Sequence, residues 1–162
     1  MATHVTPFDY RHRIAGPMPG YGANTIRYFV PIGRVLFALI FIVSAPHHFS
    51  EGAVNYAAQH GVPAAQIAVP VAGILAFLGG LSIALGFRAR IGALLLLAFL
   101  VPVTLYMHAF WNEIDPMMAQ MQMVNFMKNL ALFGATLYIA YFGAGPVSFD
   151  AYQEEPTGTP SS

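Results

Sequence analysis

Hydrophobic residues gather in four stretches of the chain, each of about 20 residues and with very few charges. A helix of about 20 apolar residues crosses the hydrocarbon core of a bilayer, and it pairs its backbone N–H and C=O groups within the segment. The pattern therefore predicts an all-α protein, an integral membrane four-helix bundle. The predicted spans are residues 27–46, 67–87, 91–110 and 125–143.

The polar stretches between and around the spans predict the remaining organisation. Ser50 and Glu51 resemble a helix start and Gly61 a helix stop, so a short interfacial helix is expected between the first two spans. The N-terminal region lacks the apolar core of a cleaved signal peptide, and we expect it to be retained. Three segments result: an N-terminal extension over residues 1–26, a membrane domain over 27–146 and a solvated C-terminal tail over 147–162.

Charged residues make up 9% of the chain, against about 25% in an ordinary soluble domain. The net charge is zero, which gives nucleic acid no basic surface to bind. The expected partners are membrane lipid and other integral membrane or redox subunits.

The distribution of positive charge predicts an orientation. Arg88 and Arg90 form the turn between the second and third spans, and further arginines precede the first span. The loops over residues 47–66 and 111–124 contain neither Lys nor Arg. By the positive-inside rule both termini face the cytoplasm (N-in/C-in) and both of these loops face outward. The expected location is the prokaryotic cytoplasmic (inner) membrane, crossed several times.

The chain contains no cysteine, so it has no disulfide, no thiolate metal ligand and no thiol nucleophile. His47 and His48 are adjacent, and no two histidines have the i, i+4 spacing of a helical metal site. We therefore predict neither a metal site of this kind nor a catalytic residue, and any electron carrier must belong to another molecule.

Unusual polar groups stand at the outward ends of three spans. His48 follows the first, His108 and Trp111 end the third, and Lys128 and Asn129 begin the fourth. The three-residue spacing places His108 and Trp111 on one helix face. In a four-helix arrangement these five residues are expected to surround one shallow outer pocket. Two alternatives stay open: Trp111 belongs to the aromatic belt of the interface, and His108 is a structural histidine.

Two cations lie inside the predicted spans in addition to Arg27, which begins the first span. A buried ammonium needs a partner or a path to the interface, so Lys128 is expected to bind a ligand oxygen or to pair with Glu113 or Asp115. Arg34 in the first span is expected to extend its side chain toward the cytoplasmic face.

Two further patterns concern packing and soft ligands. Small residues recur every fourth position in the second span, which predicts close contact with another helix. The segment MMAQMQMVNFM contains five methionines, which fit either Cu(I) or an apolar surface that touches lipid or a partner. The small residues are Ala72, Ala76, Gly80 and Ala84, and the methionines are Met117, Met118, Met121, Met123 and Met127.

Several segments, taken in order, resemble the DoxX family of membrane proteins. They are RVLFALIFIVSAPHHF, AAQHGVPAA, LGGLSIALGFRARIGALLLL, HAFW and NFMKNLALFGATLYIAYFGAGPVSFD, which together span about residues 33–150. The resemblance implies a small four-helix membrane protein associated with quinone-linked redox systems, related to the membrane subunit of thiosulfate:quinone oxidoreductase. It also implies a set of characteristic polar positions: Arg90, His108, Trp111, Lys128, Asn129 and Asp150.

Two positions depart from the family pattern as it is usually seen. Ala76 stands where many relatives have glutamate, and His48 stands where they often have lysine. Losing a membrane acid and a lysine together removes a buried pair suited to proton handling or quinone binding. This favours an accessory subunit over a self-sufficient enzyme.

Three hypotheses follow from the sequence. The first is a subunit of a quinone-linked respiratory or redox complex, whose outer pocket of His48, His108, Trp111, Lys128 and Asn129 binds a quinone head group as a non-covalent cofactor. The second is a purely structural or assembly subunit that packs within a membrane complex. The third is a small transporter or copper-handling protein.

Overall fold

The computed structural model describes residues 26–154 of the 162-residue chain, and every regular element in this part is a helix. Four of these helices are long and apolar enough to cross a membrane, which confirms the all-α class and the four-helix membrane bundle. Most of the predicted extension over 1–26, and the tail beyond residue 154, lie outside the described residues. The long helices are α3 (Phe29–Ser44), α5 (Ala65–Leu85), α6 (Ala89–Met107) and α7 (Pro116–Phe142).

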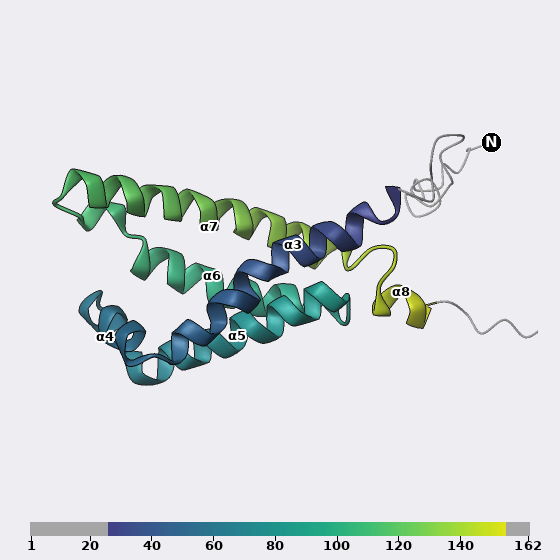
Figure 1. Ribbon diagram of the computed structural model, residues 1–162, viewed down its shortest axis with the longest axis horizontal. Helices are drawn as coiled ribbons and strands as arrows, with labels where there is room; N and C mark the ends of the chain where they lie inside the picture. Colours follow the sequence, from purple (N-terminus) through teal and green to yellow (C-terminus); the bar gives the residue numbers. More distant parts are fainter. Residues whose placement is uncertain (1–25, 155–162) are drawn as a thin grey trace, which may run out of the picture.

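Each long helix packs mainly on its neighbour in the chain: α3 on α5, α5 on α6, and α6 on α7. Figure 1 shows that α7 diverges from α3 and α5 toward one end of the bundle. This end carries η1 (Ala45–Phe49), α4 (Glu51–Gln59) and η2 (Phe110–Asn112), and we call it the histidine end. The opposite end, with the α5–α6 turn, the C-terminus of α7 and α8 (Phe149–Glu154), is the arginine end.

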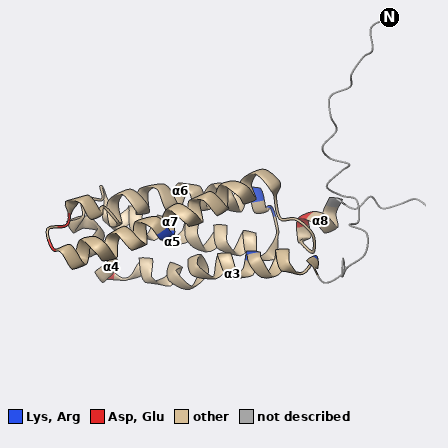
Figure 2. Ribbon diagram, turned by 90° about the horizontal axis from the view of Figure 1, so that it is seen from above, with Lys and Arg blue, Asp and Glu red and all other residues tan. Residues whose placement is uncertain are grey.

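The two ends differ in charge as the sequence predicted. Figure 2 shows acidic residues in the loop before α7 at the histidine end, and basic residues mainly toward the end that carries α8. Such asymmetry is what sets the orientation of multi-spanning membrane proteins. The placement of both termini in the cytoplasm stays a prediction.

The predicted close packing of the second span is confirmed, and the structure identifies its partners on both sides. A Cβ atom on Gly79 would lie 2.9 Å from the carbonyl oxygen of Gly92 on α6. A Cβ atom on Gly80 would lie 3.3 Å from the carbonyl oxygen of Ala38 on α3. Gly80 of the predicted stripe and its neighbour Gly79 therefore let α5 approach α3 and α6 at once, and the nearby Ala76 is fully buried.

The interfacial helix is also confirmed as α4. The Ser50 hydroxyl accepts a hydrogen bond from the backbone N–H of Ala53 at 3.2 Å, which caps the first turn. The chain leaves the helix through Gly61, whose φ of 78° lies in the left-handed region that glycine tolerates.

The start of the fourth span differs from the prediction. Helix α7 begins at residue 116 and not at residue 125, so most of the predicted outer loop is helical. One Asp115 carboxylate oxygen accepts hydrogen bonds from the N–H groups of Met117 and Met118, at 2.8 and 2.9 Å. Pro116 occupies the first turn, where a missing N–H costs nothing. This cap places the methionine-rich segment on a helix instead of in a loop.

The C-terminal segment docks on the arginine end. The guanidinium of Arg34 donates hydrogen bonds to the carbonyl oxygens of Ala144 and Val147, the latter at 2.8 Å. The side chain thus extends toward the arginine end as expected, but it is only 6% exposed and binds the protein instead of solvent. It fixes the chain that follows α7 onto α3.

Candidate functional site

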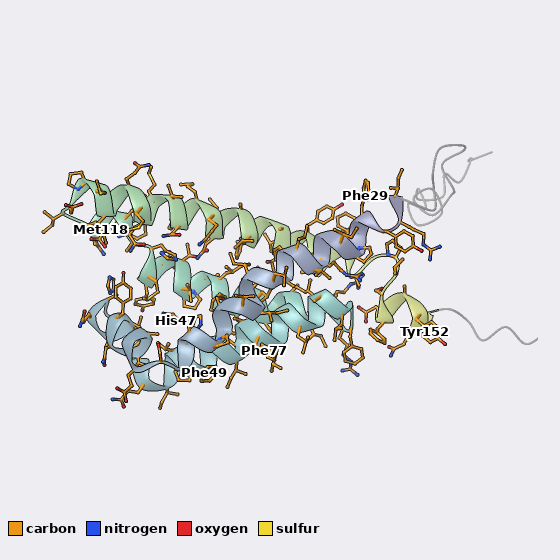
Figure 3. All side chains as sticks on the ribbon, viewed as in Figure 1. Phe29, His47, Phe49, Phe77, Met118 and Tyr152 are labelled. Carbon is orange, nitrogen blue, oxygen red and sulfur yellow. The ribbon has the colours of Figure 1, made fainter. Side chains whose placement is uncertain are left out.

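A cavity of about 840 Å³ lies at the histidine end, and side chains from η1 and from all four long helices line it together with α4. It occupies the region where α7 diverges from α3 in Figure 1. His47, which is labelled in Figure 3, is among its lining residues. A volume of this size suits a small organic ligand.

A hydrogen-bonded chain of three side chains borders the cavity and joins three elements. The His108 ring nitrogen Nδ1 lies 2.8 Å from Oε1 of Gln122 on α7. The Gln122 amide nitrogen in turn donates to the hydroxyl of Tyr56 on α4, at 3.3 Å. Gln122 is only 6% exposed, and these two hydrogen bonds give both the oxygen and the nitrogen of its buried amide a partner. The chain fixes one side of the His108 ring and leaves Nε2 without a bonded partner among the described residues.

Helix α7 presents further polar groups to the cavity. Gln122, Asn125 and Asn129 recur at intervals of three and four residues, so they share one helix face. Asn129 donates to the Thr104 hydroxyl on α6 at 3.2 Å, and Lys128 donates to the Asn125 side-chain oxygen at 3.1 Å. These bonds leave the Lys128 ammonium with two N–H donors and the Asn129 amide with one.

His48 lines the cavity from η1. Its Nδ1 lies 3.1 Å from the carbonyl oxygen of Ser44, and because a carbonyl only accepts, Nδ1 carries the proton. In the neutral ring Nε2 is therefore an acceptor. The ring packs edge-on against Phe99, with centroids 5.6 Å apart, so it has an aromatic neighbour as well as a polar tip.

The remainder of the cavity wall is apolar. Ile40 and Phe41 line it from α3, Phe99 and Leu100 from α6, and Leu132 from α7. The polar groups on α7 lie between residues 122 and 129, toward the histidine end, while Leu132 lies one turn farther along the same helix. The cavity is thus amphipathic, with a polar part near the membrane surface and an apolar part deeper in the bundle.

The structure brings together four of the five predicted site residues. His48, His108, Lys128 and Asn129 line the cavity, and Trp111 does not. The predicted helix face shared by His108 and Trp111 is absent because α6 ends at Met107, and the His108 backbone, with φ of −124°, already leaves the helix.

Trp111 belongs to a separate aromatic cluster. Its ring packs edge-on against Phe110 and Phe126, with centroid distances of 5.1 and 5.8 Å. It is 54% exposed, as expected for a residue of the interfacial aromatic belt.

The ion pair considered for Lys128 does not form among the described residues. Its ammonium binds Asn125, while the Asp115 carboxylate caps α7. The Lys128 charge is therefore not compensated by an acid of this part of the chain, which keeps it able to bind an oxygen of a ligand.

Sequence reasoning missed Tyr56, Gln122 and Asn125. The spacing of Gln122, Asn125 and Asn129 indicates a polar helix face only when the helix begins before residue 122, as α7 does. Recognition of Asp115-Pro116 as a helix start would have revealed it.

Over residues 26–154, no three His, Asp or Glu side chains converge on a point that could hold a metal ion. Among the methionines, Met117, Met118, Met121 and Met127 are exposed on α7. Their exposure is what a surface in contact with lipid or a partner requires.

Comparisons with known proteins agree with this architecture. The family model described as DoxX matches residues 29–109. The Escherichia coli inner membrane protein YphA is 30% identical over 138 residues, covering 78% of this chain and 98% of the relative. The inner membrane protein YqjF of the same organism is 31% identical over 124 residues, covering 75% and 88%. No solved structure matches the chain.

Proposed function

Because the chain belongs to the DoxX family of inner-membrane proteins, we propose that it is an integral membrane subunit of a quinone-linked redox complex. Its role in this proposal is to bind the quinone and not to catalyse electron transfer alone. The observation that carries the proposal is the amphipathic cavity at the histidine end. A quinone has the same division, with a polar head group and an apolar isoprenoid tail.

The side chains of the cavity fit both redox forms of such a head group. A quinone carbonyl accepts hydrogen bonds, and Lys128 and Asn129 retain N–H donors for it. A quinol hydroxyl donates, and Nε2 of neutral His48 accepts. Phe41 and Phe99 supply an aromatic wall, and Ile40 and Leu132 line an apolar route for the tail.

The accessory role rests on what the chain's own side chains provide. The sequence has no cysteine, so it offers no iron–sulfur ligand and no thiol redox pair. Ala76 stands where many relatives have glutamate, and it is fully buried among apolar residues of α5 and its neighbours. The electron donor is therefore expected on a partner subunit.

A second candidate function, a structural or assembly subunit, is favoured by the apolar surface at the tip of the histidine end. Ile114 is 98% exposed and Met117 is 79% exposed, beside the half-exposed Trp111. A neighbouring subunit that packs on these residues would bury them. The copper-handling alternative would rest on Met117 and the other exposed methionines of α7.

The experiment is purification in mild detergent followed by native mass analysis and lipid extraction. The quinone-to-phospholipid ratio in the purified protein is compared with that of the parent membranes. Quinone enrichment that falls in His108→Ala and Lys128→Ala supports quinone binding. Gln120→Ala is the control, because Gln120 is an exposed polar residue of α7 that does not line the cavity.

The same preparation separates the alternatives. A stoichiometric partner with no quinone enrichment would favour the structural subunit. Copper that survives dialysis and disappears when Met117 and Met121 are replaced would favour the copper-handling protein.

A further inference from the structure

A second cavity, of about 530 Å³, lies at the arginine end. The start of α6, the C-terminal end of α7 and the segment through α8 enclose it. Arg88 and Arg90 both line this cavity, which is separate from the candidate quinone site at the opposite end of the bundle. Figure 2 shows basic residues beside α8 in this region.

The two guanidinium groups keep their N–H donors free as far as the fold is described, and the Arg88 group lies 5.9 Å from the centroid of the Phe87 ring. Neither guanidinium donates a hydrogen bond to a residue within 26–154, in contrast to Arg34. Arg88 also has a backbone φ of 48°, a left-handed conformation for which glycine or asparagine is the usual residue. The turn itself therefore does not require the long cationic side chain found there.

The cavity has an excess of positive charge. Arg88 and Arg90 contribute +2 and Asp150 contributes −1, which leaves +1 among the charged residues that line it. The two Asp150 carboxylate oxygens accept hydrogen bonds from the backbone N–H groups of Arg88 and Ala89, at 2.6 and 3.0 Å. The acid thus caps the N-terminus of α6, where the helix dipole already favours negative charge.

The rim of the cavity is apolar and faces lipid. Ile91 and Phe142 line it and are 49% and 53% exposed. One turn farther into the membrane, Leu94 on α6 and Tyr138 on α7 are 59% and 65% exposed. The cationic cavity therefore adjoins an exposed apolar surface. This arrangement matches a phospholipid, which has a charged head group and apolar acyl chains.

We propose that this cavity binds the phosphate of an anionic phospholipid head group. The Arg88 and Arg90 guanidinium groups supply paired N–H donors that match phosphate oxygens. The acyl chains then lie along the exposed apolar residues of α6 and α7. Lipid bound here would hold the α5–α6 turn against the C-terminal segment.

The test uses the full chain in a mild detergent, titrated with phosphatidylglycerol and, separately, with phosphatidylcholine. Native mass spectrometry measures the bound lipid. We expect phosphatidylglycerol to bind more tightly, and Arg88→Gln and Arg90→Gln each to weaken it about fivefold. Arg27→Gln is the matched control, because Arg27 is an exposed arginine near the same end that does not line the cavity. Circular dichroism checks that each variant keeps its helices.

Two results would overturn the proposal. If Arg27→Gln weakens phosphatidylglycerol binding as much as the other two variants do, the lipid responds to diffuse charge and not to this cavity. A competition with millimolar inorganic phosphate distinguishes a site for the phosphate of a lipid head group from a site for free phosphate. If phosphate occupies the site and phosphatidylglycerol does not, the lipid assignment is wrong and the site is one for a soluble anion.

Discussion

Gly73 on α5 provides a direct test of how the fold positions the candidate quinone site. A Cβ atom at this position would lie 2.8 Å from the Cβ of His48, 3.2 Å from the Ala45 carbonyl oxygen and 3.2 Å from the Phe49 ring. Two of these three atoms belong to or adjoin the backbone and have no rotamer by which to move away. Ordinary contacts begin at 3.4 Å, so η1 and α5 must separate by about 0.6 Å in Gly73→Ala to restore one.

Overpacking of this kind costs about 1–3 kcal/mol. Replacing glycine by alanine inside a helix also stabilises the folded state by about 0.5–1 kcal/mol, because alanine has the higher helix propensity. Gly134→Ala is the matched control, since Gly134 lies inside α7 and a Cβ there would meet nothing within 4 Å. Because the gain in helix propensity is common to both variants, the difference between them isolates the clash with η1.

The assay is unfolding in mixed detergent micelles with increasing dodecyl sulfate, followed by far-ultraviolet circular dichroism. We expect Gly73→Ala to be less stable than Gly134→Ala by about 1–3 kcal/mol. We also expect it to retain less quinone, because the displaced segment carries His48. Equal stability of the two variants would refute the close approach of η1 to α5 and, with it, the position assigned to His48.

Three further predictions use the same unfolding and quinone assays. Asp115→Ala removes the cap of α7 and should lower the free energy of unfolding by about 1 kcal/mol, whereas Asp115→Asn should preserve most of it. Arg34→Met leaves two carbonyl oxygens at the arginine end without their donor and should cost about 1–3 kcal/mol, and wild-type stability would contradict the docking of the C-terminal segment. Trp111→Phe should leave quinone enrichment unchanged, and a loss equal to that of His108→Ala would place Trp111 in the site after all.

The fold was accessible from the sequence because the membrane reduces the problem to a few strong signals. Length and hydropathy alone located all four spans, and the interval of four between small residues on α5 predicted close packing. The partners of that packing could not be predicted, because a stripe of glycine and alanine has no complementary pattern on the helix it contacts. The structure shows contacts with both α3 and α6.

The candidate site was predictable only in part. His48, His108, Lys128 and Asn129 were identified as unusual polar residues at span ends, and the structure brings them to one cavity. The three-residue spacing places Trp111 in the site only if the helix continues through it, and α6 ends at Met107. Helix ends depend on single caps and turns, and an error of a few residues there rotates a side chain out of a site.

The C-terminal segment was the least predictable part. The interactions of Arg34 with Ala144 and Val147, and of Asp150 with the start of α6, join residues that are far apart in sequence. Hydropathy reports burial in lipid, but it does not report which charged residue finds a partner inside the protein. For Arg34 the local pattern predicted the direction of the side chain but not the carbonyl oxygens that it binds.

The central claim, that the cavity at the histidine end holds a quinone head group, is tested most directly by photolabelling. A quinone analogue with an azido group on its ring is equilibrated with the purified protein and illuminated, and the labelled peptides are identified by mass spectrometry. We expect labelling near His48 and Tyr56 and between residues 122 and 129, with suppression by excess unlabelled quinone. Labelling confined to the lipid-facing surfaces of the helices, or unaffected by unlabelled quinone, would contradict the claim.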